Sequence, residues 1–176
     1  MPRLPLLAQL WFIVTAPVVI IDAIFVLSRS KLENEPHPLA ETSPFNYWVL
    51  YATYDKRYAP NDDAFVVVQS WLNLLEVSLG LFAVFLSWRG DACSSIQLAF
   101  AVSVMTLYKT VMYLVIDIIE GGKYTQHNTP MDTITMVVLP SLVWVVMPAI
   151  VIKLCMQRIC VVAHNKEAAA GKQKKA

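Results

Sequence analysis

The sequence predicts an all-α, multi-pass membrane protein: a bundle of four transmembrane helices around an internal ligand cavity. Three observations support this fold class. Of the 176 residues, 57% are hydrophobic and only 15% are charged, whereas soluble domains carry about 25% charged residues. Four segments are long and apolar enough to cross a bilayer, which takes about 20 residues. Each segment also carries a polar stripe, and burying these stripes against one another costs less than exposing them to lipid.

The predicted spans are residues 9–27, 64–88, 96–119 and 134–156. A short turn at 89–95 joins the second and third spans, which predicts an antiparallel hairpin. We expect residues 28–63 to form a luminal loop and residues 157–176 a basic cytosolic tail. Asp22 lies inside the first span and no small-residue cleavage site follows, so this span is not expected to be a cleaved signal peptide. A single membrane domain over residues 1–156 is therefore predicted.

The distribution of lysine and arginine predicts the orientation. With both termini in the cytosol, that side collects Arg3, Arg89, Lys153 and the tail lysines, as the positive-inside rule requires. Lys174 and the residues around it resemble a dilysine signal for retrieval to the endoplasmic reticulum, which a receptor would read. The alternative is a generic basic tail near an anionic leaflet.

Several classes of partner are not expected. The formal charge is +1, which gives no reason to expect binding to nucleic acid. No glycine-rich phosphate-binding motif is present, so no nucleotide cofactor is predicted. Cys93, Cys155 and Cys160 do not have the spacing of a metal site, so no metal is predicted. The bilayer and a small molecule are the expected partners, and a homodimer is left open.

Polar residues inside the spans are candidate site residues, because ionisable groups in a bilayer are costly and face the bundle interior. Counted along each helix, they fall into two layers. The layer nearer the lumen contains Asp22, Gln69, Tyr113 and Ser141, and the layer near the midplane contains Asn73, Glu76, Lys109 and Trp144.

The deeper layer predicts an ion pair between Glu76 and Lys109, since a lone charge at that depth is expensive. Such a pair could take part in chemistry or only hold the helices in register. Asp22 has no cation in its layer, so it could act as an acid or be a protonated group that bonds to Gln69 or Tyr113. Trp144 could stabilise a cation or only pack.

The segment after the first span carries a resemblance to a known family. Residues 48–58 read W-V-L-Y-A-T-Y-D-K-R-Y, and Asp63 opens the second span. This W-x-x-Y-A-x-x-D-x-R-Y pattern followed by an acid resembles the EXPERA family. That family includes the emopamil-binding protein, which is a sterol double-bond isomerase, and the sigma-2 receptor. Weaker matches are the acid-bearing 22–27 segment, the 103–113 segment, and W-x-x-x-P at 144–148. The similarity covers about residues 18–153.

This resemblance implies a four-helix bundle in the endoplasmic reticulum, with a cavity open to the membrane for a sterol or a cationic amphiphile. In the isomerase members, acids protonate a ring double bond, a tryptophan face stabilises the carbocation, and a base removes a neighbouring proton. By position, Asp22 corresponds to the first acid and Trp144 to the aromatic wall. Tyr108, Tyr113 and Ser141 would line the pocket.

The sequence also departs from the isomerase pattern. Val18 stands where the isomerase has a histidine one turn before its first acid. The second-helix glutamate maps near Gln69 or Ser70, about two turns from Glu76, and the third helix gains Lys109.

The first functional hypothesis is an isomerase or cyclase that acts on a sterol-like or terpenoid compound by acid–base proton transfer. An alternative is a non-catalytic lipid-binding or trafficking protein like the sigma-2 receptor. A component of an ion pathway is a third, which the absence of an inverted repeat disfavours. The candidate catalytic residues are Asp22, Glu76 and Trp144, and the candidate ligand-binding residues are Gln69, Asn73, Tyr108, Lys109, Tyr113 and Ser141.

Overall fold

A computed structural model describes residues 3–33 and 35–173, with side chains as far as residue 159. The described residues form helices and turns without a strand. The long helices are α1 (Leu6–Ser28), α3 (Ala64–Trp88), α4 (Ala92–Ile119) and α6 (Leu139–Gln173), and the short elements are α2 (Phe45–Tyr54), α5 (Pro130–Asp132) and the π-helical η1 (Thr133–Val138). Four helical segments are long and apolar enough to cross a membrane, the last running over Pro130–Ile159. The predicted fold class is confirmed.

Helix α3 begins and ends as predicted, whereas the third and fourth spans begin a few residues early because side-chain caps start their helices. Asp91 accepts a hydrogen bond from the backbone N–H of Ser94 at 3.1 Å, so α4 begins at 92 rather than 96. Thr129 accepts one from the backbone N–H of Asp132 at 3.2 Å, with a proline following it, so the last span begins at 130 rather than 134. Proline at the first helical position favours such a start.

Two other segments also differ from the prediction. The expected luminal loop at 28–63 contains the ten-residue helix α2, which is too short and too polar in its flanks to stand out in the sequence. Helix α6 continues to Gln173, so the predicted tail is helical where the structure describes it, and its location in the cytosol stays a prediction. Residues 174–176, with two of the tail lysines, lie outside the described residues.

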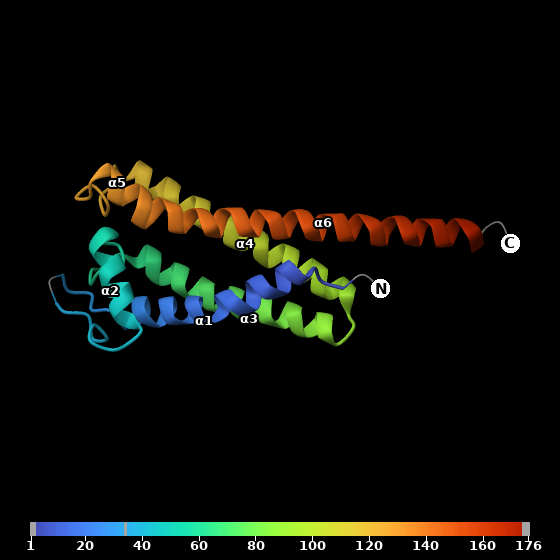
Figure 1. The fold of residues 1–176 in the computed structure, drawn as a ribbon, viewed down its shortest axis with the longest axis horizontal. Helices are drawn as coiled ribbons and strands as arrows, with labels where there is room; N and C mark the ends of the chain where they lie inside the picture. The colour runs from blue at the N-terminus through green and yellow to red at the C-terminus, as the bar shows by residue number, and fades with distance from the viewer. Residues whose placement is uncertain (1–2, 34, 174–176) are drawn as a thin grey trace.

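The four long helices run side by side, and α2 lies across one end of the bundle (Figure 1). We call residues 35–63, which include α2, the cap. Both chain ends lie at the opposite end of the bundle, which we call the terminal end. Helix α3 packs on α1 and α4, and α4 packs on α6, whereas α1 and α6 barely meet. The ring of helices is therefore open on one side. The location of the termini in the cytosol and the homodimer stay predictions.

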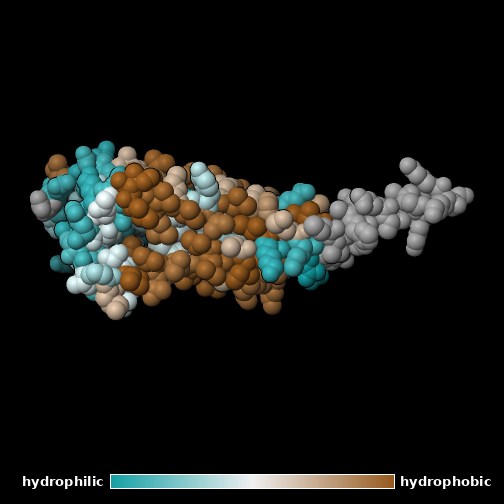
Figure 2. Space-filling model, turned by 90° about the horizontal axis from the view of Figure 1, so that it is seen from above, coloured by the Kyte–Doolittle hydropathy of each residue, from teal (hydrophilic) through white to brown (hydrophobic). Residues whose placement is uncertain are grey.

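The surface has the banding of a membrane protein. On the face in view, Figure 2 shows a hydrophobic belt across the middle of the bundle, with hydrophilic residues gathered at the cap end and a smaller hydrophilic patch toward the terminal end. Large apolar side chains are exposed in this belt, among them Trp71, Phe82 and Val146. Because soluble proteins seldom expose apolar surface on this scale, the belt indicates contact with lipid.

Two apolar clusters close the two ends of the bundle. The terminal-end cluster includes Phe12, Val84, Val102 and Val151 together with small residues. The cap-end cluster packs α1 and α3 against α2 and is built on Phe25, Val26, Ala52 and Val66. The polar residues identified from the sequence lie between these clusters, so the fold sets aside an interior space at mid-depth.

Close contact between α1 and α3 depends on Gly80. A Cβ atom on Gly80 would lie 2.7 Å from Cδ1 of Phe12, which itself is buried in the terminal-end cluster. Small residues at such crossings allow helix backbones to approach in membranes.

We predict that Gly80→Ala destabilises the bundle by about 1–3 kcal/mol, the usual range for overpacking. Ser78→Ala on the same helix is the matched control, because Ser78 is exposed and bonds only within its own helix. The free energy of unfolding in mixed micelles would measure both. Equal stability of the two variants would contradict the close packing.

Candidate functional site

A cavity of about 360 Å³ lies inside the bundle between the two apolar clusters. Drug-sized ligands occupy pockets of roughly 300–1,000 Å³. All four long helices and the cap contribute to its wall. Of the nine candidate residues predicted from the sequence, eight line this cavity: Asp22, Gln69, Asn73, Glu76, Lys109, Tyr113, Ser141 and Trp144.

Tyr108 is the exception, and its predicted place in the pocket is wrong. Its side chain is 71% exposed and does not line the cavity. Lys109 and Tyr113, four residues apart, share the inward face of α4. Because each helical residue turns the side-chain direction by about 100°, Tyr108 points outward.

The predicted ion pair at mid-depth is confirmed. Lys109 Nζ lies 2.9 Å from Glu76 Oε1, and both residues are buried. The other carboxylate oxygen of Glu76 accepts a hydrogen bond from Thr106 Oγ1 at 2.8 Å. Lys109 also donates to Asn73 Oδ1. The charge of Glu76 is thus balanced, and both of its oxygens are bound by protein groups.

Asp22 has a different environment. Its Oδ1 accepts a hydrogen bond from Trp48 Nε1 at 2.9 Å, and no described cation forms an ion pair with it. The expected partner was Gln69 or Tyr113. Trp48 takes that place because α2 inserts it into the cavity wall. Among the described residues, Asp22 is therefore the carboxyl group in the cavity that forms no ion pair, whereas Glu76 is paired with Lys109.

Trp144, on α6, lines the cavity beside α1, the helix that carries Asp22. Its ring packs against Trp11 with centroids 5.2 Å apart and ring planes at 63°, and both residues line the cavity. This edge-type contact joins α6 to α1 where the two helices otherwise barely meet. The orientation of the Trp144 ring is therefore fixed by a second aromatic residue.

The remaining predicted residues hold their polar groups in distinct ways. The hydroxyl of Ser141 donates to the backbone carbonyl of Val137 at 2.7 Å. Gln69 has its Oε1 buried without a hydrogen-bond partner among the described residues. Tyr113 is buried, and its hydroxyl donates to Asp55 Oδ2.

Sequence reasoning missed the contribution of the cap. Tyr47, Trp48 and Tyr51 from α2 and Tyr58 beyond it also line the cavity. These residues belong to or border the segment that carries the family resemblance. The three-residue spacing of Trp48 and Tyr51 puts both on one face of a helix, which could have revealed them had the segment been read as helical.

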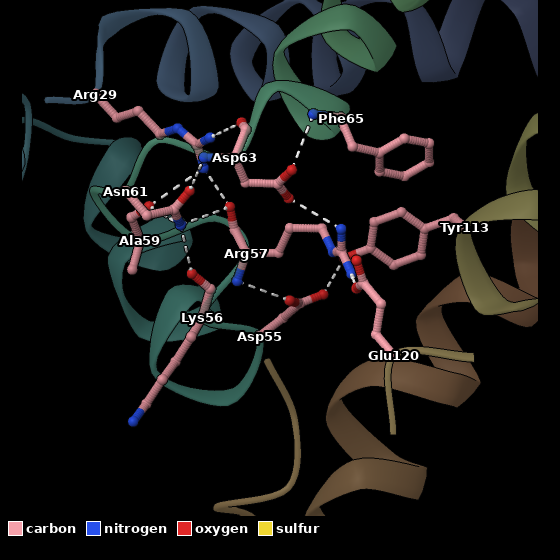
Figure 3. A network of polar contacts seen from close by, with 10 residues as sticks. All are labelled: Arg29, Asp55, Lys56, Arg57, Ala59, Asn61, Asp63, Phe65, Tyr113 and Glu120. Atoms are coloured by element: carbon pink, nitrogen blue, oxygen red, sulfur yellow. Dashed lines mark hydrogen bonds and ion pairs between the residues drawn. The ribbon is translucent and has the colours of Figure 1, made fainter. Parts of the chain in front are cut away.

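Arg57 holds the cap on the bundle (Figure 3). Its side chain is 2% exposed, and Nη1 lies 2.9 Å from Asp63 Oδ2 at the start of α3. Nη2 pairs with Glu120 at the end of α4. The guanidinium also stacks over the ring of Tyr124 at 4.3 Å from its centroid. One buried cation therefore joins the cap to two helix ends.

Arg29 reinforces the same region from the end of α1. Its guanidinium donates to the backbone carbonyls of Arg57, of Ala59 at 3.2 Å and of Asp63 at 2.6 Å. Figure 3 shows these bonds converging on the turn that follows α2. The turn is fixed by side chains because it forms little regular backbone structure of its own.

Asp55 lies behind the cavity wall and is 1% exposed. Burial raises the pKa of its carboxyl group, while hydrogen bonds from Tyr113 and from the backbone of Arg57 act in the opposite direction. Burial, followed by the charge of Asp55, also raises the pKa of Tyr51 well above its ordinary value. Tyr51 therefore keeps its phenolic proton near neutral pH.

The cavity reaches the surface on the open side of the helix ring. Val18, Tyr47 and Pro140 line the cavity and are also exposed. They come from α1, α2 and α6, and we call the opening between them the mouth. Among the described residues, no group of three or more His, Cys, Asp or Glu side chains could hold a metal ion.

The sequence is similar to curated proteins with named activities. It is 26% identical over 163 residues to a probable 3-beta-hydroxysteroid-Delta(8),Delta(7)-isomerase of Arabidopsis thaliana, an alignment that covers 92% of this chain and 70% of that protein. It is 24% identical over 135 residues to isomeliandiol synthase MOI2 of Melia azedarach, which covers 77% of this chain and 60% of that protein. No protein-family model matches the chain, and no solved structure matches it significantly.

We predict that Arg57→Ala destabilises the protein by about 3–5 kcal/mol, because it leaves two carboxylates unpaired. Arg57→Lys is expected to recover only part of this loss, since lysine keeps the charge but not the planar fork. Arg89→Lys, at the exposed terminal end, is the control for the chemical change. Unfolding in mixed micelles measures all three, and an unchanged Arg57→Lys protein would refute the bridging role.

Proposed function

We propose that this protein is an isomerase or cyclase that acts on a sterol-like or terpenoid substrate within the membrane. One observation carries the proposal: a single cavity holds the unbalanced carboxyl group of Asp22 and the aromatic wall of Trp144. The names of the two relatives, a sterol isomerase and a synthase, support the reaction class. Membership of the EXPERA family is part of this proposal.

Asp22 and Glu76 would have different roles. A carboxyl group that no cation balances can hold a proton and release it to a substrate. Glu76 is paired with Lys109 at 2.9 Å and accepts a second hydrogen bond from Thr106. Both of its carboxylate oxygens are therefore occupied by protein groups and are not free to exchange a proton with a substrate. We therefore assign proton transfer to Asp22 and an electrostatic role to Glu76.

The reaction would proceed through a carbocation. The Asp22 carboxyl group gives its proton to one carbon of a substrate double bond, and the neighbouring carbon becomes cationic. The face of Trp144, farther along the same cavity, would stabilise positive charge on the substrate skeleton. Loss of a proton from an adjacent carbon to the Asp22 carboxylate then forms the shifted double bond. Alternatively, a hydroxyl group of the substrate adds to the cation, closes a ring and gives its proton to that carboxylate. The double-bond shift returns the proton and consumes no co-reactant.

Access to the cavity would come from the bilayer. The mouth opens between α1, α2 and α6, and the helices that border it expose apolar side chains such as Val18 and Leu139. A rigid, mostly hydrocarbon molecule dissolved in lipid could enter without crossing water. We further propose that both termini lie in the cytosol, on the strength of the lysine and arginine distribution. The resemblance to the EXPERA family supports a location in the endoplasmic reticulum membrane.

A second function, binding without turnover, is favoured by one specific residue. Val18 lines the cavity one turn before Asp22, where the isomerase pattern has a histidine. Without that group, Asp22 could serve only to anchor a ligand. Incubation of the purified protein with sterols and terpenoids, followed by mass spectrometry, separates the two functions, because only the enzyme forms a product.

We predict that Asp22→Asn lowers the turnover rate by about 10²–10⁴-fold, the usual contribution of general acid–base catalysis. The asparagine can still accept the Trp48 hydrogen bond but has no proton to transfer. Asp62→Asn is the matched control, because Asp62 is exposed in the cap and distant from the chemistry. Turnover by Asp22→Asn at the wild-type rate would show that another group transfers the proton.

The Glu76–Lys109 pair gives a separate prediction. Glu76→Gln or Lys109→Met alone leaves one buried charge without its partner and should cost about 3–5 kcal/mol. The double variant removes both charges, so it should be more stable than the sum of the single losses predicts, with a coupling of about 1–3 kcal/mol. The free energies of unfolding in mixed micelles would measure the cycle, and strictly additive losses would argue against an energetic coupling between Glu76 and Lys109.

A further inference from the structure

The cap end of the cavity is rich in hydrogen-bond acceptors. Tyr51, Tyr58, Gln69 and Tyr113 line the cavity there. Asp55 lies directly behind two of these residues and does not line the cavity itself. The hydrogen bonds that each group already makes determine which groups at this end can donate to a ligand and which can accept from it.

Asp55 accepts hydrogen bonds from the hydroxyl groups of two tyrosines. Its Oδ2 accepts from Tyr113 and, at 3.4 Å, from Tyr51. Its Oδ1 accepts from the backbone N–H of Arg57 at 3.1 Å. Both side-chain oxygens of Asp55 thus act as acceptors, and both tyrosine protons point toward Asp55 and away from the cavity. The phenolic oxygens of Tyr51 and Tyr113 can therefore only accept from a ligand.

Gln69 adds an acceptor that the protein leaves unused. Its Oε1 is buried and has no partner among the described residues. A buried acceptor without a partner destabilises a protein, and a donor supplied by a ligand would remove this cost. The N–H of Trp48, a donor in the same wall, is already bonded to Asp22.

Tyr58 supplies the complementary group. Its hydroxyl makes no hydrogen bond to another described residue, and burial raises its pKa well above the ordinary value. Tyr58 therefore stays protonated, and its hydroxyl group can donate a hydrogen bond into the cavity. A group that both donates to Gln69 or Tyr113 and accepts from Tyr58 would satisfy this end of the site.

We propose that the cap end of the cavity is a subsite for a ligand hydroxyl group, formed by Gln69, Tyr58, Tyr51 and Tyr113, with Asp55 as a positioning residue. This inference rests on the proposed function and deepens it by orienting the ligand. The alcohol points toward the cap, and the hydrocarbon skeleton extends toward Phe12, Val77 and Val102 at the terminal side of the cavity. A ketone accepts but cannot donate, so it leaves Gln69 Oε1 without a partner.

The test compares an alcohol with its ketone. The probes are radiolabelled 5α-cholest-8-en-3β-ol and 5α-cholest-8-en-3-one, and the full-length protein is held in lipid nanodiscs. We expect the wild-type protein to bind the alcohol at least about tenfold more tightly than the ketone, because the ketone leaves a buried acceptor unpaired.

Three variants locate this preference. Gln69→Leu and Tyr113→Phe each remove an acceptor and should lower the alcohol-to-ketone ratio severalfold. Asp55→Asn should lower it as well, since an asparagine amide can donate to the tyrosines and turn their protons toward the ligand. Tyr108→Phe is the matched control, because Tyr108 is on the same helix as Tyr113 but exposed outside the cavity. The ratio is the readout because a merely structural loss would weaken both ligands alike.

The outcomes distinguish this inference from the proposed function. Equal affinity of the wild-type protein for alcohol and ketone, or an unchanged ratio in Gln69→Leu and Tyr113→Phe, would overturn the subsite, and turnover of the alcohol would still support the enzyme. A strong, variant-sensitive preference for the alcohol without product formation would support the subsite and overturn the enzymatic proposal. If neither probe binds, the sterol-like ligand and its subsite are both wrong.

Discussion

The buried guanidinium of Arg57 is the interaction on which the rest of the structure depends. The cap has only one short helix, α2, which packs on α1 and α3 through the cap-end cluster. Arg57 pairs with acids at the ends of α3 and α4, while Arg29 holds the turn from the end of α1. These bonds fix the position of α2, and with it Trp48 and Tyr51. Without them the cavity would have no defined wall at this end.

The interior combines polar groups in two distinct states. The Glu76–Lys109 pair is balanced and bound on several sides, so it adds a fixed dipole to the cavity rather than a free charge. Asp22 and Gln69 retain capacity for a ligand, one as an unbalanced carboxyl group and the other as an unpaired acceptor. If every polar group had a protein partner, the interior would be an ordinary packed core. Here, among the described residues, Asp22 and Gln69 lack part of their partners, and a ligand in the cavity could supply them.

Hydropathy and helical spacing in the sequence predicted the parts of the structure that depend on them. The four spans are long apolar runs that hydropathy identifies. Glu76 and Lys109 lie deep in two of these spans, so their pairing could be predicted from the free-energy cost of leaving either charge unpaired in the bilayer. Tyr108 was misplaced because the family motif named it, whereas the helical phase set by Lys109 and Tyr113 directs it outward. The partner of Asp22 could not be predicted, because Trp48 reaches it through a fold of the cap that side-chain bonds from Arg57 and Arg29 determine. No local pattern encodes such long-range contacts.

The mouth has a consequence for how occupancy of the site is set. Helices α1 and α6 barely meet apart from the contact between Trp11 and Trp144, so the route that we propose for the ligand passes between them from the lipid. A ligand that enters there partitions from the bilayer, and the quantity that governs saturation is its mole fraction in the lipid rather than its aqueous concentration. Apparent affinity will therefore change with the amount and the thickness of the membrane that surrounds the protein, even when no residue of the cavity changes.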